Sequence, residues 1–118
     1  MSPAEQGRRM AAAARERGVF LMEAMWSRFL PAYRTMMELI GEGRIGDPMM
    51  VEADFGFRKE FDPHHRLFDL QLGGGSTMDV GIYPAHLCSL VLGAPDQVQA
   101  TGDIGPTGSD DTMAAVLH

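Results

Sequence analysis

The amino-acid sequence predicts an α/β fold, and two patterns carry that prediction. A capped helical segment ends at Gly18 and leads directly into the apolar run 19–25, as happens where an α/β unit feeds a buried parallel strand. Further along the chain, helical and extended patterns follow one another, with turns rich in glycine or proline between them. We expect this second part of the chain to be α+β in character.

The first helix has both start and stop signals. Ser2 is the expected N-cap, Pro3 the first helical residue and Glu5 the acid of a capping box. The helix then covers residues 4–17 and stops at Gly18, because glycine readily takes the left-handed conformation of a helix end.

The run 19–25 is short, mostly apolar and bounded, so it predicts a buried strand. A parallel strand needs neighbouring strands, and nothing in front of the first helix supplies them. We therefore expect the chain to begin in the middle of a larger domain.

A second helix and a strand are expected next. Pro31 opens the helix, its apolar stripe has the i, i+3, i+4, i+7 spacing, and Gly41 and Gly43 end it. Partial alternation of apolar and polar residues then predicts a strand over 48–57.

The last third of the chain predicts one helix and two strands. A long loop of mixed charge covers 58–75, and a helix follows over 78–92. Pro84 removes one backbone donor from that helix, so we expect an irregular first turn or a kink. Residues 98–104 and 112–118 are expected as strands.

Composition excludes several classes of protein. The chain has 118 residues and a net charge of −6 without any lysine or arginine run, so nucleic acid is not an expected partner. No apolar stretch approaches the length of a membrane span, and the N-terminus lacks the apolar core of a secretory signal. The single cysteine, Cys88, cannot form an internal disulfide, which favours a reducing compartment. We expect a cytoplasmic protein that binds a small molecule and no membrane.

The segment 73–83 carries the clearest functional signal. Three glycines end a loop where backbone can approach a ligand closely, and an apolar helix pattern then begins. Asp79 and Tyr83 are four residues apart and therefore lie on one helical face. A carboxylate beside a phenol can move a proton, although two ordinary polar residues after a glycine-rich turn are the alternative. His86 lies on the same face, where it either lines the cleft or is a structural histidine.

The stretch 41–46 matches G-x-G-x-x-G, the dinucleotide-binding fingerprint, in the wrong context. The fingerprint needs a strand before it and a helix after it, so that the N-terminus of the helix faces the pyrophosphate. Here a helix comes first and a strand is expected next. The glycines therefore predict the end of a helix and a turn.

A metal site is not expected. The candidate ligands have no spacing that favours one, and adjacent histidines on a loop rarely bind the same ion. These candidates are Asp62, His64, His65, Asp69 and His86, and we expect the Asp-Pro-His-His stretch 62–65 to form a surface turn instead.

Trp26 and Arg28 directly follow the expected buried strand. Ligands in open α/β sheets collect beyond the carboxyl ends of the strands, so Trp26 is a candidate cleft wall and Arg28 a candidate binder of an anion or a polar substrate. Simple packing of the indole and solvation of the guanidinium are the alternatives. Phe55, Phe57 and Phe61 could form an aromatic wall, with core packing as the expected role of Phe55.

With these residues assembled, the chain resembles the glucose–fructose oxidoreductase/inositol dehydrogenase family, known as Gfo/Idh/MocA. Residues 22–31 look like the last strand of the family's nucleotide-binding domain and the crossing into its second domain. Residues 39–47 and 51–57 look like its next helix end, turn and strand, and residues 73–83 look like its catalytic segment. The similarity is greatest to the branch that includes dihydrodiol dehydrogenases and glucose–fructose oxidoreductase, where tyrosine stands in place of a catalytic histidine.

The resemblance implies an NAD(P)-dependent oxidoreductase that moves hydride between nicotinamide and a hydroxyl or carbonyl carbon of a sugar, polyol or dihydrodiol-like substrate. By position, Tyr83 would be the general acid/base and Asp79 would assist it. Trp26, Arg28 and Phe57 would help line the substrate cleft, with the first two also against the cofactor. The implied fold is a helix–strand remnant of a Rossmann domain, followed by part of a mixed or antiparallel sheet with helices on one face.

Departures from the family pattern make a fragment the expected interpretation. The glycine-rich nucleotide-binding segment and a Glu-Lys-Pro segment are missing, and further strands of the second domain would follow His118. Residues 1–28 would be the remnant of the dinucleotide-binding domain, and 29–118 part of a substrate-binding domain that also forms homo-oligomers. Such a chain would bind NAD or NADP weakly and be inactive alone. The alternatives are a stand-alone dimerisation or interaction module and a metal-dependent lyase or isomerase.

Overall fold

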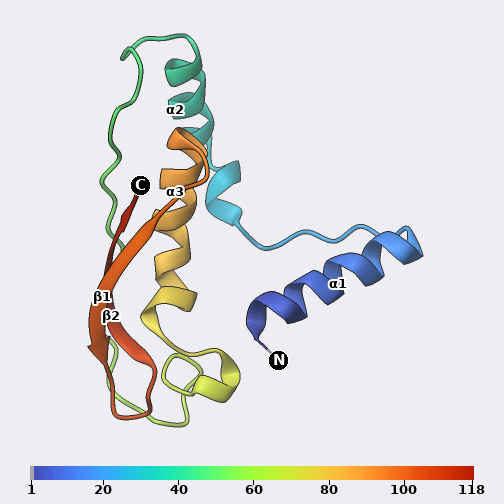
Figure 1. The fold of residues 1–118 in the computed structure, drawn as a ribbon, viewed down its shortest axis with the longest axis vertical. Coiled ribbons are helices and arrows are strands. Elements are labelled where there is room, and N and C mark those ends of the chain that lie inside the picture. The colour runs from blue at the N-terminus through green and yellow to red at the C-terminus, as the bar shows by residue number, and fades with distance from the viewer. Residues whose placement is uncertain (1) are drawn as a thin grey trace.

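The computed structural model describes residues 2–118, and these form three α-helices, three short helical turns of other types and one antiparallel sheet (Figure 1). The α/β composition expected from the sequence is confirmed. In chain order the elements are α1 (Pro3–Arg17), η1 (Trp26–Phe29), α2 (Pro31–Gly41), η2 (Leu70–Leu72), η3 (Thr77–Gly81), α3 (Ile82–Leu92), β1 (Val98–Ile104) and β2 (Asp110–Leu117).

Helix α1 begins and ends as the sequence predicts. The hydroxyl of Ser2 accepts a hydrogen bond from the Glu5 backbone N–H at 3.3 Å, and the Glu5 carboxylate accepts one from the Ser2 backbone N–H at 2.7 Å. This reciprocal pair is the predicted capping box, with Pro3 in the first turn. Gly18 ends the helix with φ at 63°, in the left-handed region.

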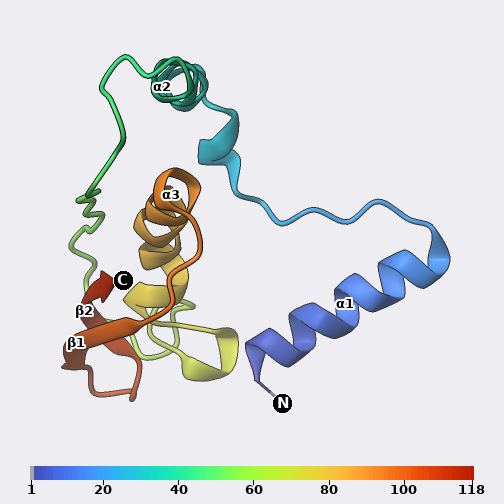
Figure 2. The same ribbon diagram turned by 45° about the horizontal axis from the view of Figure 1, so that its top comes forward.

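The predicted strand over 19–25 is wrong. These residues form no ladder, and most of their apolar side chains are exposed, with Phe20 at 87% of its full accessibility. A strand is stable only where neighbouring backbone pairs with it, and among the described residues none lies alongside this run. The run instead connects α1, which stands apart in both views, to the remainder of the chain (Figures 1 and 2).

Helix α2 ends in a closed glycine turn. Gly43, with φ at 69°, donates its N–H to the carbonyl of Ile40, and Arg44 donates to Leu39. This is the Schellman pattern of a helix C-terminus, followed by a second turn at Gly46. The predicted helix end is confirmed, and the backbone N–H groups of this turn bond to the helix rather than facing outward to a phosphate.

The predicted strand over 48–57 is also wrong. The segment passes beside α3, where the Val51 carbonyl lies 3.9 Å from the sulfur of Cys88, but it does not join the ladder. Alternation of side chains defines two faces of an extended chain but supplies no partner for its backbone. The alternating pattern alone therefore led to a wrong prediction of a strand.

The helix that carries Asp79 and Tyr83 starts irregularly, as Pro84 predicts. Its first turn, η3, is a π-helical turn, and regular α-helix begins only at Ile82. In a regular helix the proline ring would clash with the carbonyl four residues earlier, and it has no N–H to donate. The wider turn accommodates the proline, and such π turns are frequent at functional sites.

The two predicted C-terminal strands are confirmed as an antiparallel pair, β1 and β2, with Val98 opposite Leu117 and Gly102 opposite Met113. The register shifts near Ile104, which pairs with Asp110. Figure 2 shows α3 on one face of this pair, and the same strand β2 brings Met113 beside Gly81 at the end of η3.

The chain encloses little of its own apolar surface. Its accessible area is 9455 Å², against about 6,300 Å² for a compact folded monomer of this size. Its radius of gyration is 16.8 Å, against about 13.5 Å for such a monomer. Among the described residues Ala14 and Val80 are the buried apolar side chains. Within the same residues, no helix has the length and apolar character needed to cross a bilayer.

Candidate active site

Tyr83 and Trp26 meet although 57 positions separate them. The indole Nε1 of Trp26, in η1, lies 3.0 Å from the phenol oxygen of Tyr83, in α3. Their rings meet edge to face with centroids 5.9 Å apart. Because an indole N–H can only donate, the phenol oxygen is the acceptor, and the phenol's own proton remains available for another group.

Phe55 completes this aromatic group. Its ring centroid lies 5.6 Å from that of Tyr83. The side chain is 49% exposed, so the expectation that it serves core packing is wrong. Phe57 is 58% exposed, and its place in a cleft stays a prediction. Phe61 packs against Phe68 at 5.1 Å instead, so the three phenylalanines do not form one wall.

Asp79 has a partner that the sequence did not single out. Arg66 Nη1 lies 2.6 Å from Asp79 Oδ1, joining the long loop to the π turn. Asp79 keeps only 19% of its side-chain accessibility, whereas Arg66 keeps 67%. The pair therefore fixes the carboxylate while much of the guanidinium still faces solvent. Among the described residues the carboxylate of Asp79 accepts its hydrogen bond from Arg66 and not from Tyr83.

The glycines before this helix serve close approach, though not to a ligand as the sequence suggested. A Cβ on Gly74 would lie 2.9 Å from backbone atoms of Leu67 and Asp69. A Cβ on Gly75, where φ is 125°, would overlap Asp110 Oδ1. Both glycines are buried and donate backbone hydrogen bonds to the loop, Gly75 to Leu67 at 2.9 Å. Gly74 and Gly75 therefore hold the start of the helical segment with Asp79 and Tyr83 close to the protein's own loop and strand.

Asp110 holds the start of the π turn, although more than 30 positions of sequence separate the two. Its Oδ2 accepts hydrogen bonds from the Ser76 hydroxyl, the Thr77 hydroxyl and the Thr77 backbone N–H, each 2.7 Å long. Partial burial is the largest influence on the carboxyl and favours its neutral form. The hydrogen bonds from Ser76 and Thr77 together outweigh it and hold the pKa of Asp110 below its usual value.

Sequence reasoning missed Arg66 and Asp110 as parts of this site, and it expected Phe55 to pack in the core. Ser76 and Thr77 at a helix start gave a usable signal, because hydroxyl residues there predict a capping interaction. Nothing in the local pattern shows that the cap comes from the C-terminal strand.

His86 and Arg28 are placed differently from the aromatic group. The Nε2 atom of His86 is buried and has no hydrogen-bond partner among the described residues, which is compatible with a ligand contact or with a structural role. Arg28 is exposed in η1, two residues after Trp26. Their roles in binding stay predictions.

The loop histidines and acids have local structural partners. Asp62 Oδ1 accepts the backbone N–H of His64 at 2.9 Å, and Nδ1 of His65 accepts that of Leu67 at 3.2 Å. Asp69 caps η2. Within residues 2–118, no three potential ligands from histidine, cysteine, aspartate and glutamate gather as a metal site would require.

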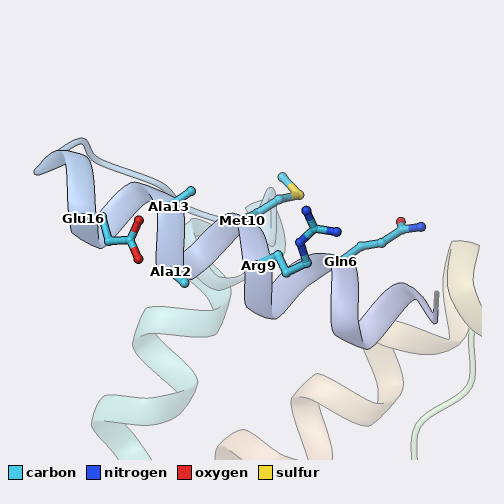
Figure 3. Close-up of a pocket in the computed structure, with 6 residues that line it drawn as sticks. All are labelled: Gln6, Arg9, Met10, Ala12, Ala13 and Glu16. Carbon is cyan, nitrogen blue, oxygen red and sulfur yellow. The ribbon is translucent and has the colours of Figure 1, made fainter.

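A separate hollow of about 550 Å³ lies along α1 (Figure 3). Every residue that lines it comes from that one helix, and none belongs to the group around Tyr83. One helix face cannot surround a ligand, so this hollow is not a candidate active site.

A family model described as the GFO/IDH/MocA C-terminal domain matches residues 33–118. The chain therefore belongs to the GFO/IDH/MocA family.

Among its relatives is the trans-1,2-dihydrobenzene-1,2-diol dehydrogenase of Mus musculus, with 43% identity over 117 residues. The enzymes of the same name from Bos taurus and Homo sapiens are 40% and 37% identical over 117 residues. Each of these alignments covers 98% of this chain and 34% of the relative. The chain thus spans about a third of the length of the curated relatives that it matches.

Proposed function

We propose that this chain contributes the proton-transfer part of the active site of an NAD(P)-dependent oxidoreductase. The reaction moves a hydride between nicotinamide and a hydroxyl or carbonyl carbon of a sugar, polyol or dihydrodiol-like substrate. Membership of an oxidoreductase family and similarity to enzymes named dihydrodiol dehydrogenases support the reaction class.

The single observation that carries the proposal is the hydrogen bond from Trp26 to Tyr83. It fixes the phenol oxygen as an acceptor at a partly exposed position, with Phe55 on another side. A phenol held in this way can donate its proton to a carbonyl oxygen during reduction, or take a proton from a hydroxyl during oxidation.

The other residues have supporting roles in this proposal. Asp79, held by Arg66, places a negative charge on the same helical segment and assists proton transfer or binds a substrate hydroxyl. Arg28 binds polar groups of substrate or cofactor, and Phe57 and His86 line the substrate cleft.

The residues present fit one end of a nicotinamide cofactor. Trp26 is 56% exposed and offers a flat face to a planar ring, beside the phenol that would handle the proton. The cofactor would supply the hydride acceptor or donor. The turn at 41–46 does not fit the pyrophosphate, because its backbone N–H groups already bond to carbonyls of α2 and of the turn itself.

The experiment is to replace Tyr83 by phenylalanine in the full-length gene product and to measure turnover of a dihydrodiol with NAD(P). Tyr83→Phe keeps the ring and removes the hydroxyl, so kcat should fall by about 10²- to 10⁴-fold, the usual contribution of general acid–base catalysis. Nucleotide KM should change little, because the proposal places most cofactor contacts outside this chain.

The matched control is Tyr33→Phe, since these are the two tyrosines of the sequence and Tyr33 lies on α2. That control should keep its turnover. A folded Tyr83→Phe protein with more than about half of the original kcat would contradict the proposal.

A second candidate, a self-associating interaction module, is favoured by the exposed sheet. Both outer edges of the β1–β2 pair are unpaired among the described residues, and Val98, Ile104 and Val116 are exposed on it. We infer homo-oligomers through this sheet, in the cytoplasm. Calorimetric titration of the 118-residue chain with NADH and NADPH should give no saturable heat at millimolar concentration for either candidate. Turnover of the full-length gene product separates the candidates, because a loss of kcat in Tyr83→Phe is expected only of the enzyme. Light scattering that shows a clean monomer would contradict self-association.

A further inference from the structure

We propose that Asp110 is a positioning residue for the reaction, because it sets where the segment carrying Asp79 and Tyr83 begins. This inference depends on the proposed role of Tyr83. It concerns a residue of the C-terminal strand, outside the segment that the sequence marks as functional.

The contacts of Asp110 converge on one point. One carboxylate oxygen accepts three hydrogen bonds, two of them from Thr77 and one from Ser76. The first N–H groups of a helical segment have no partner within it, and Ser76 does not cap the π turn with its own side chain. Asp110 supplies that cap from another element, and its negative charge is favourable at a helix start.

The sheet explains how Asp110 reaches this position. Asp103 pairs with Thr112 and Ile104 with Asp110, so Asp111 is an extra residue in β2. A bulge of this kind turns the next side chain to the opposite face of the strand. Asp110 is thereby placed on the side where Met113 lies beside the π turn.

The path from Asp110 to the phenol is short and rigid. Thr77 is the first residue of η3, Asp79 lies within it, and Tyr83 is the second residue of α3. Gly75 lies two residues before Thr77 and cannot move toward Asp110, because Asp110 already fills the space where a side chain of residue 75 would be. A change at Asp110 therefore shifts the whole turn, and displacing a catalytic group by about 1 Å can cost about 100-fold in rate.

The test is Asp110→Asn in the full-length gene product, with Asp111→Asn as the matched control. Asparagine keeps the shape and removes the charge that strengthens the three hydrogen bonds. We expect kcat to fall by about 10- to 100-fold while nucleotide KM stays within about two-fold. Asp111→Asn should leave both unchanged. A milder variant, Thr77→Val, removes one of the three hydrogen bonds and should lower kcat by about 3-fold.

A double variant separates positioning from general destabilisation. In a Tyr83→Phe background, Asp110→Asn should lower kcat by less than about two-fold further, because the group it positions has been removed. Turnover of Asp110→Asn equal to that of Asp111→Asn would overturn the inference. An equal loss in both backgrounds would also overturn it.

Hydrogen exchange gives a readout that does not need activity. Asp110→Asn should raise amide exchange in residues 77–83 and leave α2, residues 31–41, unchanged. If Tyr83→Phe keeps its turnover, the proposed function fails. The exchange measurement then tests the role of Asp110 separately, because unchanged amide exchange in residues 77–83 would show that Asp110 does not hold this segment.

Discussion

The two ends of the chain are held in different ways. Residues 2–18 form a helix whose start and stop are determined by neighbours within five positions, such as the capping box between Ser2 and Glu5. Residues 66–118 are held by contacts between distant positions, including Trp26 with Tyr83 and Asp110 with Thr77. The first region makes contacts between neighbours in sequence and stands apart from the remainder (Figure 1). In the second region, contacts from Trp26, Arg66 and Asp110 converge on the helical segment that begins at Thr77.

The residues that bear on function are held by long-range contacts and not by local ones. Local contacts determine that α1 forms, and most of its described side chains remain exposed. Long-range contacts are the ones that place a phenol, a carboxylate and an arginine around the same turn. Changes to the second region should therefore affect stability and chemistry together, and equivalent changes to the first should affect neither strongly.

The largest expected effect on stability comes from one glycine in the long-range region. Gly75→Ala should lower the free energy of unfolding by about 2–4 kcal/mol, because the new Cβ meets Asp110 and the backbone has φ of 125°. Gly18→Ala is the matched change in the local region, with φ of 63° and open space around it. It should cost about 1–2 kcal/mol, the strain of a left-handed alanine alone. Urea denaturation of the two variants measures both values, and equal losses would remove the distinction between the regions.

A smaller effect is expected in acid. The pKa of Asp110 lies below its unfolded value of about 3.9, so its carboxylate contributes stability at higher pH that is lost as pH falls through the folded-state pKa. Thermal unfolding followed from pH 6 to pH 3 should show a smaller loss of Tm in Asp110→Asn than in the unchanged protein.

Glu5 provides the local counterpart. Hydrogen bonds from the Ser2 backbone and hydroxyl lower the pKa of its exposed carboxyl. Glu5→Gln should reduce the helical circular dichroism of α1 and leave the acid dependence of cooperative unfolding as it was. If Glu5→Gln changed that dependence as much as Asp110→Asn, the two regions would unfold as one unit.

Sequence reasoning succeeded where the deciding signal was local. The caps of α1, the Schellman turn at Gly43 and the irregular helix before Pro84 all follow from residues within one or two turns. Antiparallel pairing of β1 with β2 was within reach because a short turn joins them.

The failures share a cause. Within residues 2–118 no backbone pairs with the strands expected over 19–25 and 48–57, and no pattern within a strand can reveal this. In the same way, the pairing of Arg66 with Asp79 and the reach of Asp110 to Thr77 depend on the loop path and on a strand bulge. The sequence alone indicated Asp79 and Tyr83 as candidate site residues, whereas the residues that hold them could be identified only from the fold.

If Trp26 and Tyr83 act as one unit in proton transfer, as proposed, a double-mutant cycle on kcat will show coupling between them. Trp26→Phe keeps an aromatic ring and removes the N–H that bonds the phenol oxygen. In the full-length gene product it should lower kcat by about 3- to 10-fold, the value of one hydrogen bond. In the Tyr83→Phe background the same change should cost less than about two-fold. Fold losses that multiply in full would contradict the claim, because they would show that the indole and the phenol work independently.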